Sequence, residues 1–95
     1  MKYDDFIDCL NDGKPPINLK LILLALWFDK KGDWDKAHRL VQNETGKDYA
    51  LIHAYLLRKE GDLWNSNYWY EKSGDKMPGY SLSEEWQILA KRFTN

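Results

Sequence analysis

The chain has 95 residues, with 14 basic and 15 acidic side chains and a net charge of −1, which suits a single domain. No long basic run occurs, so we expect no nucleic-acid partner. The longest apolar run, Leu21 to Phe28, is too short to cross a membrane, and the first ten residues lack the apolar segment of a signal peptide. We therefore expect a cytoplasmic protein with no membrane attachment.

The apolar residues follow helical periods and no alternating strand pattern appears, which predicts an all-α fold of about six helices. A first helix is predicted over residues 3–10, ending before Gly13 and the Pro15-Pro16 pair. We expect Asn18 to cap a second helix over residues 19–31, with Gly32 ending it. A third helix is predicted over residues 34–42.

The second half of the chain repeats these signals. After a loop over residues 43–47, we expect Asp48 to cap a helix that continues to Glu60 and stops at Gly61. A fifth helix is predicted over residues 63–72. Ser81 and Glu84 form a capping box for a last helix, which places five apolar residues on one stripe: Leu82, Trp86, Leu89, Ala90 and Phe93.

An internal repeat joins the two halves. The segment ALWFDKKGDWDKAHRLV, from Ala25, aligns with AYLLRKEGDLWNSNYWY, from Ala54, at an offset of 29 residues. Each unit contains a helix, a Gly-Asp turn and a second helix. The sequence therefore predicts two helical hairpins of similar construction.

This repeat resembles the tetratricopeptide family, which places small and large residues at matching positions of paired helices. The matching pairs here are Ala25 and Ala54, Gly32 and Gly61, Ala37 and Ser66, and Val41 and Tyr70. The resemblance implies hairpins over residues 18–42 and 48–74, capped by residues 1–16 and 81–95. The offset is shorter than the usual 34 residues and the closing proline is missing, so the hairpins should stack at an altered angle.

Residues 53–74 show a second resemblance. The pattern HAYLxRKEGD followed by YWY and a glycine is similar to a family of small uncharacterised bacterial proteins. This resemblance implies a domain of that kind and no particular activity.

The predicted fifth helix carries more aromatic residues than one face can hold. Its core stripe is expected to contain Leu63, Ser66, Tyr70 and Ser73, with Trp69 beside it. Trp64 and Tyr68 then point outward, at positions where the first repeat has Asp35 and Arg39. One interpretation is that a terminal helix covers both rings. The other is that Trp64, Tyr68 and Trp69 form a contact surface for a partner protein or a second copy of the chain.

The two histidines occupy inner positions of the hairpins. His53 aligns with Leu24, and His38 lies beside Trp34 on its own helix. These side chains fit a buried hydrogen-bond network, or a small polar pocket with Arg58 or a tyrosine hydroxyl. Their spacing matches no metal-site signature, so we expect neither a metal nor a cofactor.

Basic residues also lie at the end of the first helix of each hairpin, where their positive charge interacts favourably with the carboxyl terminus of the helix. They allow a second interpretation, in which the inner face of the stack grips an acidic peptide. On that face Tyr55 and Arg58 would lie beside Asp29 and Lys30.

No catalytic motif occurs in the chain. The leading hypothesis is therefore a protein–protein interaction or self-association module with an exposed aromatic face. The alternative is a small-molecule binder or small enzyme with a His/Tyr/Arg pocket between the hairpins.

Overall fold

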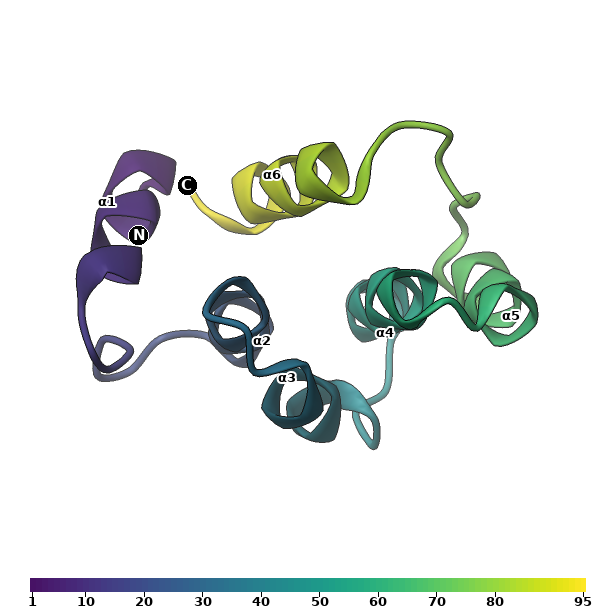
Figure 1. The fold of residues 1–95 in the computed structure, drawn as a ribbon, viewed down its shortest axis with the longest axis horizontal. Coiled ribbons are helices and arrows are strands. Elements are labelled where there is room, and N and C mark those ends of the chain that lie inside the picture. Colours follow the sequence, from purple (N-terminus) through teal and green to yellow (C-terminus); the bar gives the residue numbers. More distant parts are fainter.

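A computed structural model describes all residues, 1–95, and the fold is all-α without strands. Six α-helices follow one another (Figure 1): α1 (Tyr3–Asp8), α2 (Leu21–Lys30), α3 (Trp34–Val41), α4 (Lys47–Glu60), α5 (Leu63–Ser73) and α6 (Leu82–Phe93). A short 3-10 turn, Cys9–Asn11, extends α1. None of the helices combines the length and apolar character needed to cross a membrane.

Glycine turns join α2 to α3 and α4 to α5, and these two pairs make the most extensive helix contacts in the molecule. Gly32 and Gly61 both have φ of 93°, in the left-handed region that a residue with a Cβ rarely adopts. The aspartates that follow cap the next helices: Asp33 accepts a hydrogen bond from the Lys36 N–H, and Asp62 caps α5 in the same way. The repeated Gly-Asp pair therefore ends one helix and starts the next.

Two predicted helix starts are wrong. Asn18 does not cap α2, because its φ of 66° is left-handed, whereas a capping residue needs an extended backbone. The helix begins three residues later, at Leu21, after Lys20. Asp48 likewise lies inside α4, which begins at Lys47 after Gly46 and has no side-chain cap.

In the view of Figure 1, α2 and α4 lie in the middle of the molecule and α5 lies beside α4 at the end of the same row. Helix α3 lies on one side of this row, and α6 lies on the other side. The predicted stripe of α6 is confirmed, because Trp86, Leu89, Ala90 and Phe93 are buried and Leu82 packs partly against the core. One half of the capping box is confirmed, since the Ser81 hydroxyl accepts from the Glu84 N–H at 3.1 Å. The Glu84 carboxylate accepts from the Ser81 hydroxyl at 3.4 Å instead of from a backbone N–H.

The core side of α5 is confirmed at three of its four predicted positions. Ser66, Tyr70 and Ser73 are buried, whereas Leu63 is 52 % exposed. Its counterpart Trp34 explains the difference, because the Trp34 indole N–H donates to the Leu56 carbonyl of the next hairpin. No third hairpin follows α5, so Leu63 has no such neighbour.

Candidate protein-binding surface

The outer side of α5 exposes a group of large apolar side chains. Trp64 is 84 % exposed, Tyr68 is 46 % exposed, and Leu63 lies beside them. The half-buried Trp69 continues the group, with its ring 5.3 Å from that of Tyr68 in an edge-to-face arrangement. We call these four residues the aromatic face. No terminal helix covers Trp64 and Tyr68, because α6 packs against α2 and α4, and α1 lies at the opposite end of the molecule from α5 (Figure 1).

The five tryptophans divide into two groups by their indole N–H. The indoles of Trp27, Trp34 and Trp86 each donate to a backbone carbonyl of another segment, at 2.8–3.1 Å. The indoles of Trp64 and Trp69 donate to no acceptor within the protein. A tryptophan that stabilises a core usually has its N–H satisfied there. Trp64 therefore contributes nothing comparable to the fold.

Trp69 belongs to a column of rings between α3 and α5. Trp34 stacks on His38 with centroids 4.8 Å apart, and His53 stacks on Trp69 at 4.2 Å. Between them the Nε2 atoms of His38 and His53 lie 3.1 Å apart, so one imidazole donates to the other. The histidines are therefore hydrogen-bonded to each other, and His53 packs against the inner side of the Trp69 ring.

The surroundings of His53 favour its neutral imidazole. Burial, followed by the charge of His38, lowers the pKa of His53 from its ordinary 6.5 to about 4. The two histidines are the only metal-binding side chains at this position. The molecule contains no group of three or more His, Cys, Asp or Glu side chains that could hold a metal ion.

We predict that acid destabilises the protein through His53. Between about pH 6.5 and pH 4 the unfolded chain binds a proton that the folded chain does not bind, so the free energy of unfolding falls as the pH falls. The loss should be on the order of 2 kcal/mol, after an allowance for solvent screening. Urea unfolding at several pH values measures it in the wild type and in His53→Leu, which carries the residue of the first repeat. If the free energy of unfolding changed equally with pH in the two proteins, His53 would not be the cause of the acid destabilisation.

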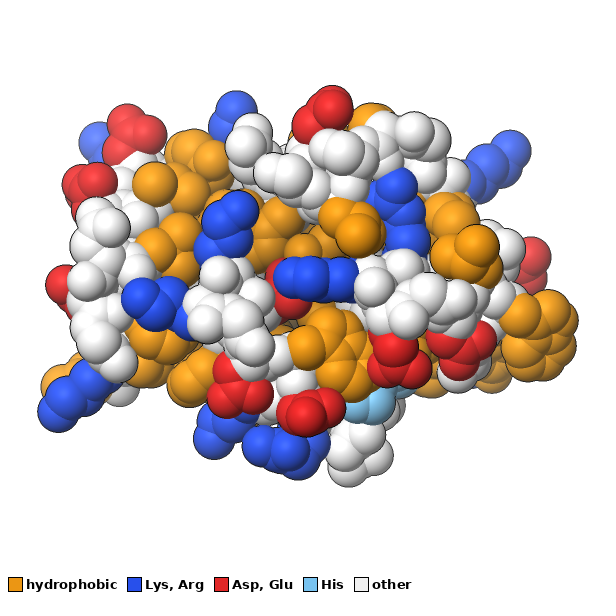
Figure 2. Space-filling view, in the orientation of Figure 1, with side chains coloured by type: hydrophobic (Ala, Val, Ile, Leu, Met, Phe, Trp, Pro, Cys, Tyr) orange, Lys and Arg blue, Asp and Glu red, His pale blue; other side chains and the backbone are white.

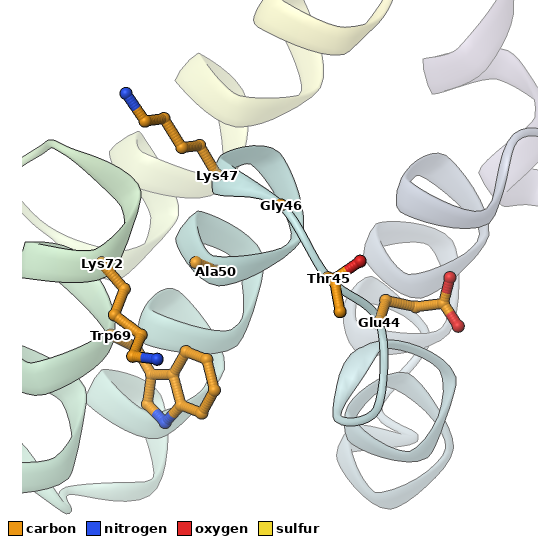
Figure 3. A pocket seen from close by; sticks show the side chains of 7 residues that line it. All are labelled: Glu44, Thr45, Gly46, Lys47, Ala50, Trp69 and Lys72. Atoms are coloured by element: carbon orange, nitrogen blue, oxygen red, sulfur yellow. The ribbon is translucent and has the colours of Figure 1, made fainter.

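A hollow of about 390 Å³ opens next to Trp69 (Figure 3). It lies between the loop before α4 and the side of α5, and its lining consists of Glu44, Thr45, Gly46, Lys47, Ala50, Trp69 and Lys72. In Figure 3, Lys72 lies beside Trp69, whereas Glu44 points away from that ring on the opposite side. The Lys72 ammonium lies 5.2 Å from the Tyr68 ring and 5.6 Å from the Trp69 ring. The hollow thus combines an aromatic wall with a cation.

Tyr55 and Arg58 lie in a different part of the molecule, on the side of α4 that faces α6. The Arg58 guanidinium pairs with Glu85 at 2.8 Å and also donates to the Tyr80 carbonyl. The Tyr55 hydroxyl donates to the buried Asp29 carboxylate at 2.5 Å. These groups do not join the histidines, so the predicted pocket residues belong to two separate networks.

The ionic networks under α6 leave their members paired. Lys59 pairs with Asp29 at 2.8 Å, and the Tyr70 hydroxyl donates to Glu85 at 2.6 Å. Burial and the neighbouring carboxylates raise the pKa of Tyr55 and of Tyr70 above the ordinary value. Figure 2, in the orientation of Figure 1, shows basic, acidic and apolar side chains alternating over the middle of the visible face, without a continuous patch of one charge.

The inner-face interpretation therefore needs a correction. The predicted neighbours Asp29 and Tyr55 are hydrogen-bonded to each other, but α6 packs over them. The Arg58 guanidinium is already paired with Glu85. An acidic peptide would have to displace a carboxylate of the chain itself. Sequence reasoning missed Glu85, although its place three residues after Leu82 and four before Leu89 is a signal that it shares their side of the helix.

Comparisons of the chain with protein-family models, with curated proteins and with solved structures found no match. The two family resemblances stay predictions, and the assignment of a function depends on the geometry of the surface.

Proposed function

We propose that the chain is a protein-binding module and that the aromatic face of α5 is its contact surface. The observation that carries the proposal is the exposure of Trp64, 84 %, directly beside the half-exposed Tyr68 on one helix. Aromatic rings bury a large area at a small cost in side-chain entropy, and tryptophan and tyrosine are enriched among the residues that dominate binding energy. Leu63 and Trp69 extend the same surface on both sides.

The internal repeat supports the proposal. The first hairpin has Asp35 and Arg39 at the positions of Trp64 and Tyr68, so a stable hairpin of this kind does not need rings there. Exposed aromatic side chains lower solubility, and a monomeric protein rarely keeps a contiguous apolar group without a use for it. A partner that covers the rings would explain their presence.

The test compares two double variants. Trp64→Ala/Tyr68→Ala removes two exposed rings of the aromatic face. Ile88→Ala/Tyr80→Ala removes two other exposed apolar side chains, 46 % and 40 % exposed, elsewhere on the surface. A partner recovered from cell extract on the wild type and on the control should be absent from the first variant. Calorimetry with the purified partner should then give a dissociation constant at least 100-fold weaker for the first variant, which corresponds to about 2.7 kcal/mol.

The thermal midpoint decides whether such a loss concerns binding or folding. We expect it to change little in Trp64→Ala/Tyr68→Ala, because neither ring supports the core. A large fall of the midpoint, or equal losses of binding in both double variants, would overturn the proposal.

A further inference from the structure

We propose that the segment bound at the aromatic face carries an acidic side chain that enters the hollow beside Trp69 and pairs with Lys72. This inference rests on the proposed function and names the chemistry of the partner: a peptide segment with an apolar side chain and a carboxylate in fixed spacing.

Lys72 is a cation without a carboxylate partner. The ion pairs of the protein are Arg58–Glu85, Lys59–Asp29 and Arg92–Asp75, and Lys72 takes part in none of them. Its ammonium instead lies near two rings of the aromatic face. Rings attract a cation weakly at an exposed site, so the ammonium keeps its capacity to bind a carboxylate.

The hollow gives that carboxylate a place. Lys72 and the Trp69 ring lie side by side on one of its walls, whereas the Lys47 ammonium and the Thr45 hydroxyl point away from them (Figure 3). The acidic residue of the lining, Glu44, points away from Trp69. Charge complementarity therefore favours an anionic side chain in the hollow.

The spacing of the two contacts limits the partner sequence. Trp64, Tyr68 and Lys72 follow one another at intervals of four residues, which places them on one side of α5 over about 12 Å. An extended peptide covers this distance in about four residues. The partner should therefore place an aromatic or aliphatic side chain about four residues from an aspartate or glutamate.

Selection from a phage-displayed library of random nine-residue peptides tests the inference. We expect the wild-type chain to enrich peptides with this spacing. The tightest selected peptide, labelled with fluorescein, should bind Lys72→Glu at least 10-fold more weakly in anisotropy titrations, and added salt should weaken its binding to the wild type. The matched control is Lys91→Glu, since Lys91 also lies in the last turn of a helix with its ammonium 5.3 Å from an aromatic ring. Binding to the control should stay unchanged.

The outcomes separate this inference from the proposed function. Enrichment of apolar peptides without acids, or binding that Lys72→Glu leaves unchanged, would overturn the inference alone. A wild-type chain that enriches no acidic peptide and sediments as a dimer, with Trp64→Ala/Tyr68→Ala sedimenting as a monomer, would identify a second copy as the occupant and overturn it as well. Selection that is indifferent to Trp64→Ala/Tyr68→Ala would overturn both.

Discussion

Replacement of Arg58 by methionine should lower the free energy of unfolding by about 3 kcal/mol, because it leaves a buried carboxylate without its counter-charge. Glu85 is 2 % exposed, and its two oxygen atoms accept from Arg58 and from the Tyr70 hydroxyl. After the substitution only the tyrosine remains as a partner, and the protein must bury an unpaired charge or pull α6 open. Urea unfolding followed by circular dichroism measures the change.

The chain contains a matched control for this experiment. Arg92 pairs with Asp75 at 3.3 Å, and both side chains are nearly half exposed, so Arg92→Met should cost no more than about 0.5 kcal/mol. The double variant Arg58→Met/Glu85→Gln should recover part of the loss, because the amide is uncharged and its oxygen still accepts from Tyr70. Equal costs for Arg58→Met and Arg92→Met would show that solvent reaches Glu85.

This ion pair also bears on function. The sequence allowed an interpretation in which Arg58 and Tyr55 hold an acidic peptide in the inner face of the stacked hairpins. In the structure, Arg58 forms an ion pair with Glu85 of α6, and the Tyr55 hydroxyl donates to Asp29. The chemistry expected of a ligand is thus supplied within the chain, whereas Trp64 and Tyr68 on the outer side of α5 stay exposed.

Helical periodicity and glycine turns were enough to predict the fold class, because both act within a few residues. All six helices and the ends of α2 and α4 near Gly32 and Gly61 follow from them. The starts of α2 and α4 were wrong, because a capping residue depends on a backbone angle that its type alone does not determine. Asn18 is a common cap and also tolerates the left-handed conformation that it has here.

The candidate surface was predictable to the extent that the repeat provided an internal comparison. The polar residues Asp35 and Arg39 marked the outward side of a hairpin, so the rings at Trp64 and Tyr68 stood out. The hollow was not predictable, because it joins Thr45 and Lys72 from segments that the sequence does not relate. The pairing of Arg58 with Glu85, 27 residues apart, was out of reach for the same reason.

The largest expected loss of stability is that of Trp86→Ala, about 4 kcal/mol, because this side chain connects three helices. The Trp86 indole donates to the Leu26 carbonyl of α2 at 3.0 Å, and its ring stacks on Phe6 of α1 at 5.9 Å. Truncation removes these contacts and leaves a cavity that the surrounding side chains fill only in part. Such a change typically costs about 3–5 kcal/mol for a buried tryptophan. For a domain of this size the thermal midpoint should fall by roughly 15–30 °C, which scanning calorimetry measures.

The same substitution at Trp64 provides the control, and the comparison ties stability to function. Trp64→Ala makes the same chemical change at 84 % exposure, so its free energy of unfolding should stay within about 0.5 kcal/mol of the wild type. Binding should show the reverse order, with a loss in Trp64→Ala at temperatures where the protein is fully folded. Similar losses of stability in both variants would show that Trp64 supports the fold, and its exposed ring would then need no partner to explain it.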